Sequence, residues 1–212
     1  MKFYRALTVI ASALVLSACM QVQTQVDAYS SIPADLEPKT IYIAPYRGVS
    51  GNSLEWQTNA RILAQTLSEK GFSVVSRQRD ARLTAYFGFG VDQGERVQTA
   101  YSIPQWGVTG YSGANTYGTV YGNTYSATTT LNPTYGVTGY STGTTTSVVY
   151  TRSVSIDMID NRNRQQVFQA KAVSRGSCNS FAPVASPIIA AVLSNFPQGK
   201  TGTVTLPMEN EC

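Results

Sequence analysis

Residues 16–19, Leu-Ser-Ala-Cys, are the first whose types and spacing indicate a specific chemistry. A cysteine after two small residues and a branched apolar one has the pattern of a bacterial lipobox, in which the thiol is acylated, commonly with palmitate. Lys2 and Arg5 supply a positive start, and residues 6–16 are apolar but too short to span a bilayer stably. We therefore expect a signal peptide at residues 1–18 and a lipidated Cys19.

Acylation of Cys19 would attach the mature chain durably to a membrane, because two or more acyl chains suffice for stable anchoring. The alternatives are an ordinary signal peptide or an unlipidated, buried cysteine. The segment also resembles Gram-negative lipoproteins, and Met20 stands where those retained in the inner membrane typically carry aspartate. The resemblance implies an outer-membrane location, and we expect the protein to face the periplasm.

Cys178 and Cys212 are the two remaining thiols. An exported protein meets an oxidising compartment, so we predict that they form a disulfide bond. This bond would close a loop of roughly 35 residues and stabilise the fold by about 3 to 4 kcal/mol on the chain-entropy model. The alternative is a Cys212 that is free or pairs with another molecule.

Catalytic motifs are almost absent. The chain has no histidine, which excludes Ser-His-Asp and Cys-His mechanisms. Residues 139–143 match the G-x-S-x-G string without its strand-turn-helix context. Asp157 and Asp160 could act as acid and base or bind calcium, although they also fit a solvated turn. We expect no enzyme, no cofactor and no metal site.

The charge balance indicates no electrostatic partner. Lys2 and Arg5 belong to the predicted leader, which has no acidic residue, so 14 basic and 12 acidic residues remain and the net charge is 14 − 12 = +2. Binding to nucleic acid normally needs a dense basic patch, so we expect none.

The elements that must position these residues follow from periodicity and turn signals. Residues 21–38 look like a linker, and Asn52 with Glu55 resembles a capping box before a helix that ends at Gly71. We expect strands at 40–46, 72–75, 83–91, 98–103, 148–158, 166–174 and 203–206, and a second helix at 187–196.

This order predicts an α+β fold: a mainly antiparallel sheet with two helices packed on one face, plus a long insert. We expect residues 19–38 to comprise the lipidated cysteine and a linker. Residues 39–212 would form a single domain, with residues 97–147 as the insert.

The insert is unusual in composition. Between Arg96 and Arg152 lie 55 residues without a charged side chain, which hold eight of the 13 tyrosines and eight of the 17 glycines. Residues 106–112, WGVTGYS, return as YGVTGYS at residues 135–141. The even spacing of Tyr117, Tyr121 and Tyr125 would place their rings on one face of an extended chain.

Two interpretations of the insert remain open. It is either a long hairpin or disordered excursion, since Gly, Thr and Ser form no core, or a binding surface built from tyrosines. The candidate partner-binding residues are Trp106, Tyr111, Tyr117, Tyr121, Tyr125, Tyr135 and Tyr140.

Five short runs carry a family resemblance over roughly residues 28–207: TIYIAP at 40–45, LSEKGF at 67–72, DARL at 80–83, IIAAVL at 188–193 and FP at 196–197. With these runs the chain resembles Gram-negative envelope lipoproteins of a domain-of-unknown-function family. The resemblance implies a compact α+β lipoprotein domain without assigned chemistry.

These observations predict a non-enzymatic outer-membrane lipoprotein with a scaffold or interaction role in the cell envelope. Its partners would be the membrane, through the lipid anchor, and an envelope protein, a glycan or other copies of itself. The alternative is a carbohydrate- or peptidoglycan-binding module in which Trp106, Tyr111, Tyr135 and Tyr140 stack on sugars. A hydrolase is a third, weaker hypothesis.

Overall fold

A computed structural model describes residues 21–208 and residue 212 of the chain. The predicted signal peptide and the lipidation site at Cys19 lie outside these residues. The described chain divides into two compact units. The sheet unit contains the residues up to Glu95 and those from Val148 onward, and the hairpin unit contains residues 96–147.

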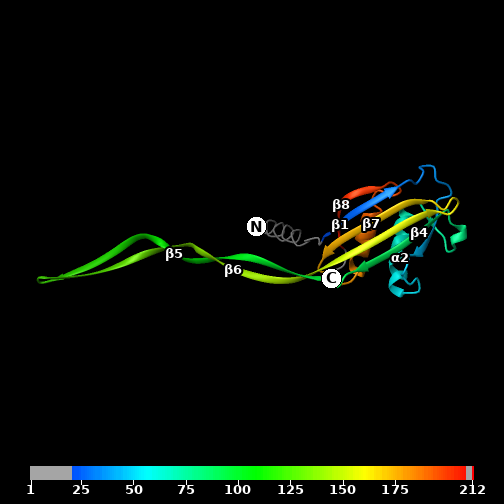
Figure 1. Cartoon of the computed structure of the whole chain (residues 1–212). Helices are drawn as coiled ribbons and strands as arrows, with labels where there is room; N and C mark the ends of the chain where they lie inside the picture. Colours follow the sequence, from blue (N-terminus) through cyan, green and yellow to red (C-terminus); the bar gives the residue numbers. More distant parts are fainter. Residues whose placement is uncertain (1–20, 209–211) are drawn as a thin grey trace, which may run out of the picture. The chain divides into compact units, whose positions relative to one another are not determined.

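The sheet has eight strands, seven of them in the order β3-β2-β4-β6-β7-β1-β8, while β5 pairs with β6 (Figure 1). The strands are β1 (Gln21–Ser30), β2 (Thr40–Pro45), β3 (Ser73–Val74), β4 (Leu83–Val91), β5 (Glu95–Tyr121), β6 (Thr124–Asp160), β7 (Gln166–Gly176) and β8 (Lys200–Pro207). The helices are α2 (Leu54–Glu69) and α3 (Ala185–Val192), with short 3-10 turns η1 (Gln78–Asp80) and η2 (Ala182–Val184).

The expected fold class, a mainly antiparallel sheet with two helices packed on one face, is wrong. The sheet is large and mixed, with 58% of the structure in strands and 16% in helices. β2 pairs in parallel with both β3 and β4, which places Ile41 beside Val74 on one side and Leu83 on the other. The physical reason is that the chain passes from β2 to β3 through α2, and a helical crossover returns the next strand in the parallel direction.

The expected linker over residues 21–38 is also wrong for its first ten residues. They form β1, which pairs with β7 on one side and β8 on the other. Alternate residues Val22, Thr24, Val26 and Ala28 are buried. Gln and Asp side chains between these positions make the segment polar as a whole. Its overall polarity therefore suggests a linker, although apolar residues recur at the period of two that is typical of a strand.

The first helix begins one residue later than the predicted capping box. Ser53 is the N-cap, and its hydroxyl accepts a hydrogen bond from the backbone N–H of Trp56 at 3.4 Å. At the other end, Gly71 adopts a positive φ of 86°, as expected for the glycine after a helix.

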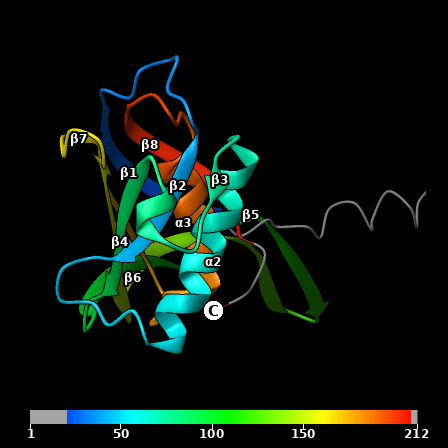
Figure 2. The same cartoon turned by 90° about the vertical axis from the view of Figure 1, so that its right-hand side faces the viewer.

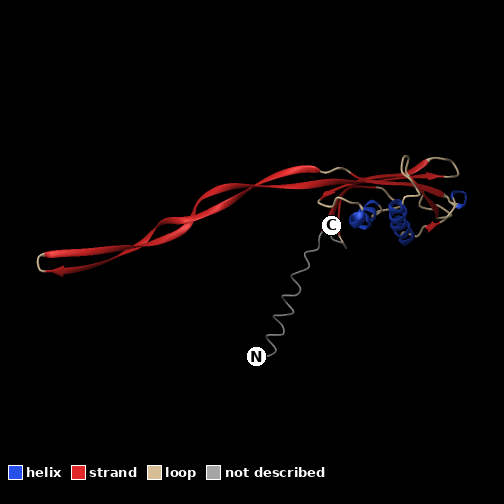
Figure 3. Ribbon diagram, turned by 90° about the horizontal axis from the view of Figure 1, so that it is seen from below, coloured by secondary structure: helices blue, strands red, loops and turns tan. Residues whose placement is uncertain are grey.

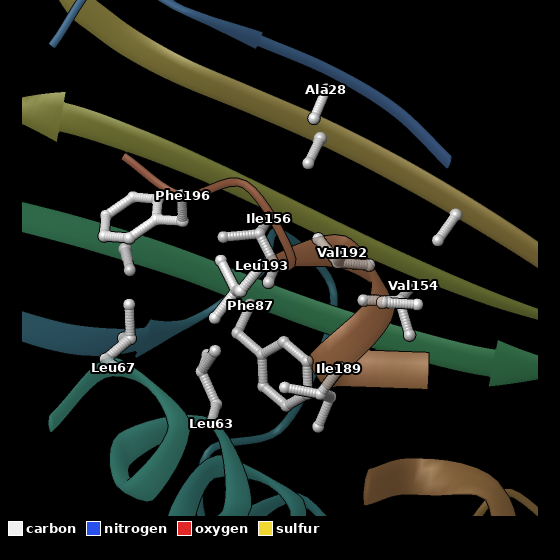
Figure 4. Packing of buried hydrophobic residues seen from close by; sticks show 14 of the residues in the cluster. Ala28, Leu63, Leu67, Phe87, Val154, Ile156, Ile189, Val192, Leu193 and Phe196 are labelled. Carbon is white, nitrogen blue, oxygen red and sulfur yellow. The ribbon is translucent and has the colours of Figure 1, made fainter. Parts of the chain in front are cut away.

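The core of the sheet unit forms where the two helices meet the strands. α3 contacts α2 as well as β1, β7 and β8, and Figure 2 shows the two helices next to each other. Figure 4 shows Leu63 and Leu67 of α2, Phe87 of β4, Ile189 of α3 and Leu193, the residue after α3, as members of one buried cluster. All five side chains are fully buried, so α3 is held by apolar contacts with both the other helix and the sheet.

Cys178 and Cys212 are paired, with their Cα atoms 5.1 Å apart, within the usual range for a disulfide. The pairing joins the last residue of the chain to the segment that follows β7. Cys178 itself is buried in the core.

One ion pair lies within the sheet unit with little access to water. Arg82 donates to both carboxylate oxygens of Asp160, at 2.9 Å from Nε and 2.5 Å from Nη2. Only 4% of the Asp160 side chain is exposed. The hydrogen bond from Arg82 holds the pKa of Asp160 below its ordinary value, and the N–H of Arg162 acts in the same direction.

The hairpin unit contributes nothing to this core. Every buried hydrophobic residue in the described chain belongs to the sheet unit. We therefore expect the fold of the sheet unit not to depend on the side chains of residues 96–147.

We predict that Asp160→Asn destabilises the protein at about pH 7 but much less at about pH 3. Because the folded-state pKa of Asp160 is lowered, its contribution is present above the unfolded pKa and is lost as the pH falls through the folded pKa. Denaturant unfolding at several pH values measures the difference. Asp80→Asn, which removes an exposed carboxylate, is the matched control. A difference between wild type and Asp160→Asn that stays constant with pH would contradict the assignment.

We also predict that replacing residues 107–143 with a short Gly-Ser turn leaves a cooperative thermal transition with a midpoint within about 4 °C of the full chain. The reason is that the deleted residues supply no buried hydrophobic side chain. Calorimetry or circular dichroism measures the midpoint. Loss of the cooperative transition would show that the hairpin unit is needed for the fold.

Candidate functional site

The predicted binding residues all lie in the hairpin unit. In this unit β5 and the first part of β6 pair with each other and wind into a long twisted ribbon (Figure 3). The chain reverses at Gly122 and Asn123, and Gly122 has a positive φ of 60°. A two-residue turn with glycine at its first central position suits the right-handed twist of a hairpin.

The seven candidate aromatic side chains are all exposed, by between 61% and 91%. Trp106, Tyr111, Tyr117 and Tyr121 lie on β5, and Tyr125, Tyr135 and Tyr140 lie on β6. Val108, Val120 and Leu131 add exposed aliphatic side chains to the same ribbon. The ribbon therefore exposes large aromatic and aliphatic side chains on both of its strands.

The predicted grouping of Tyr117, Tyr121 and Tyr125 on one extended strand is wrong. The turn at Gly122 and Asn123 lies between Tyr121 and Tyr125, so Tyr125 belongs to the returning strand. The even spacing in the sequence does not translate into one row of rings, because the chain reverses within it.

The internal repeat pairs with itself. A Cβ atom at Gly107 would lie 3.0 Å from the methyl of Thr138, and one at Gly136 would lie 3.0 Å from the methyl of Thr109. The first GVT run, at 107–109, therefore lies antiparallel to the second, at 136–138, with each glycine opposite a threonine. A threonine side chain fits over the strand where the opposite residue has no side chain.

Hydrogen bonds repeat the same symmetry. The hydroxyl of Thr109 donates to the carbonyl of Thr134 at 3.3 Å, and that of Thr138 donates to the carbonyl of Gln105 at 3.2 Å. Thr138 and Thr134 stand 29 residues after Thr109 and Gln105, which is the period of the repeat. The two copies are thus related by a local twofold axis that passes between Val108 and Val137. The sequence showed the repeat but not that its copies are partners.

The catalytic candidates are not brought together. Residues 139–143, the G-x-S-x-G match, lie within β6 and are followed by more strand. Asp157 and Asp160 point to opposite faces of β6, since they are three residues apart on a strand that pairs regularly with β4. Asp160 is paired with Arg82, so the two carboxylates form no acid-base pair.

Asp157 instead faces a shallow depression that the sequence did not indicate. Its carboxylate accepts a hydrogen bond from the Tyr46 hydroxyl at 3.0 Å, and this bond raises the pKa of Tyr46. Tyr86 and Gln166 also line the depression. Tyr46 follows β2 and Asp157 lies near the end of β6, so only the register across β4 brings them together.

A buried arginine lies elsewhere in the sheet unit. Arg152 is 3% exposed, and Nη2 donates to the Ser174 hydroxyl at 3.3 Å. Burial lowers the pKa of Arg152. Among the described residues, no carboxylate lies within 4.0 Å of its guanidinium.

The described residues include no group of three or more acidic, cysteine or histidine side chains that could hold a metal ion. Over the same part of the chain, no helix is both long and apolar enough to cross a membrane.

Structural comparison finds distant similarities. A PDZ domain protein from Parabacteroides distasonis ATCC 8503 matches at 12% identity with a TM-score of 0.43, over 92% of this chain and 41% of that one. The PelC dodecamer from Paraburkholderia phytofirmans matches at 17% identity with a TM-score of 0.41, over 81% of this chain and 95% of that one. A point variant of that PelC dodecamer matches at 18% identity with a TM-score of 0.40, with the same coverage. The present chain spans less than half the length of the first of these proteins.

Among curated proteins no relative matches the chain. A family model does match, over residues 24–198, which confirms the resemblance to a family of unassigned function. This match covers most of the sheet unit and all of the hairpin unit. The chain therefore belongs to the family described as domain of unknown function DUF4136.

Proposed function

We propose that this chain is a lipid-anchored outer-membrane protein that faces the periplasm and binds another envelope component through its hairpin unit, without catalysing a reaction. The observation that carries the proposal is the exposure of seven aromatic side chains on a ribbon that has no charge over residues 97–147 and supplies nothing to the core.

The energetics of this ribbon favour a partner. An isolated two-stranded hairpin is marginally stable in water, and this one buries no large side chain. Aromatic side chains contribute much contact area at a low cost in side-chain entropy, and their hydroxyls can hydrogen-bond at the rim of an interface. Contact with a partner would remove this apolar surface from water and stabilise the hairpin at the same time.

The anchor rests on the sequence. The positive start, the apolar segment and the lipobox before Cys19 agree with one another, and Met20 favours the outer membrane. An anchored domain also meets its partner at a raised effective concentration, so individually weak tyrosine contacts suffice.

We predict that Cys19→Ser releases the protein from membranes, because it removes the thiol that carries the acyl chains. Fractionation of cells after a high-salt wash measures the distribution. A companion change, Met20→Asp, is expected to move the protein to the inner membrane. Retention of Cys19→Ser in the outer membrane after the wash would contradict the anchor.

Binding is tested with a photoreactive phenylalanine analogue placed singly at Tyr117, Tyr140 or Trp106 in intact cells. The matched control carries the analogue at Tyr29, an exposed tyrosine of the sheet unit. We expect discrete adducts at hairpin positions and none, or far fewer, at Tyr29, because aromatic anchors concentrate binding energy in few side chains.

The same experiment separates the two classes of partner. An adduct that collapses on muramidase digestion identifies peptidoglycan and favours the carbohydrate-binding alternative. A protease-sensitive adduct of defined mass identifies a protein. Equal labelling at Tyr29 and at every hairpin position would overturn the proposed role of the hairpin unit.

A further inference from the structure

Both strands of the hairpin unit have an open outer edge. Within the described chain, β5 pairs only with β6, and the other neighbours of β6, β4 and β7, pair with it only from Tyr150 onward. The outer edges at residues 105–121 and 124–147 therefore present backbone N–H and C=O groups without a strand partner. Such an edge is a template for another strand.

Features that normally block edge pairing are scarce here. Proteins protect exposed edges with charged side chains, especially lysine, yet residues 97–151 include no charged residue. Pro104 and Pro133 are the prolines of the ribbon, and each stands two residues before one copy of the repeat. Because proline has no N–H, these residues limit pairing on one side and leave the repeat itself open.

The repeat already pairs with a copy of itself inside the hairpin. Gly107 lies opposite Thr138 and Thr109 opposite Gly136, with the valines between them. A second molecule offers the same residues. If residues 107–109 of two molecules run antiparallel about Val108, each glycine again meets a threonine and valine meets valine.

We propose that a second copy of this chain adds to the hairpin edge to edge, through antiparallel pairing of the repeat about Val108 or about Val137. The proposal rests on the proposed function and names its partner. Two identical surfaces related by a twofold axis must be self-complementary, and the repeat meets this condition. The lack of charge over residues 97–151 also means that no like charges face one another across the new pair.

The edge-to-edge pair is stabilised by backbone hydrogen bonds and by exposed side chains that gain neighbours. Val108 and Val137 are exposed in the single chain, by 45% and 39%. In the dimer the valine that lies on the axis would contact its counterpart directly across the strands. A four-stranded ribbon would also overcome the marginal stability of a two-stranded one.

Disulfide crosslinking of the full chain tests the register. Val108→Cys and, separately, Val137→Cys place a thiol on the proposed axis, directly opposite its counterpart in the second molecule. Thr116→Cys is the control, since it is equally part of β5 but lies eight residues from the axis. In a pair centred on Val108 the two Thr116 positions would be about 54 Å apart along the strands.

We expect Val108→Cys or Val137→Cys to form dimers about tenfold faster than Thr116→Cys, because directly opposite residues lie within disulfide reach. The reaction is followed on nonreducing gels with the purified protein and with intact cells, and peptide mapping verifies which cysteines are joined. Thr116→Cys must react equally with a small alkylating reagent, which controls for thiol access.

Equal dimer formation at all three positions, or none at any, would overturn self-pairing. Photoreactive adducts to another protein or to glycan, without crosslinks at residues 108 and 137, would overturn self-pairing but leave the proposed binding role of the hairpin unit in place. Val108→Lys with Val137→Lys gives a second measurement. In the dimer the lysine on the axis would lie opposite the same lysine of the second molecule, and the two positive charges would repel each other. We therefore expect the variant to sediment as a monomer under conditions in which the wild type forms dimers.

Discussion

The burial of α3 is the interaction on which the sheet unit depends. Six of its eight residues are buried, and it contacts the other helix and three strands, β1, β7 and β8. Such an apolar helix is stable in water only when nearly all of its surface is covered. That requirement accounts for the place of β1 between β7 and β8, since its buried residues Val22, Val26 and Ala28 are part of the same core. The pairing of Cys178 with Cys212 ties the end of the chain to this core.

The hairpin unit, in contrast, has no buried apolar core. Its side chains are exposed or half-buried throughout, and its strands are held by backbone pairing and by contacts such as threonine over glycine. The sheet unit uses polar groups structurally, as in the pair of Arg82 with Asp160, whereas residues 97–147 have no charged group for this purpose. Their available chemistry is that of aromatic surface, hydroxyl groups and open strand edges, and these suit binding. The proposed binding role of the hairpin unit therefore rests on its exposed tyrosines.

Local interactions were readable from the sequence. The helix that ends before Gly71, the strand at residues 83–91 and the two arms around the turn at residues 161–165 depend on periodicity and on residues close in the chain. The sequence predicted Asn52 as the N-cap of the first helix, whereas the N-cap is the next residue, Ser53. The difference is small because both residue types cap helices well. The exposed aromatic side chains of the insert were also predictable, since a segment so poor in aliphatic residues cannot cover them.

Tertiary structure alone decided which strands are neighbours and in which direction they run. The parallel pairing of β2 with β3 and β4, the place of β1 in the sheet and the contact between Arg82 and Asp160 join residues far apart in the sequence. The same is true of the repeat, whose copies could have lain apart but instead face one another. Periodicity determines whether a segment can be a strand, whereas its partner is chosen by the burial and hydrogen bonding of the whole sheet.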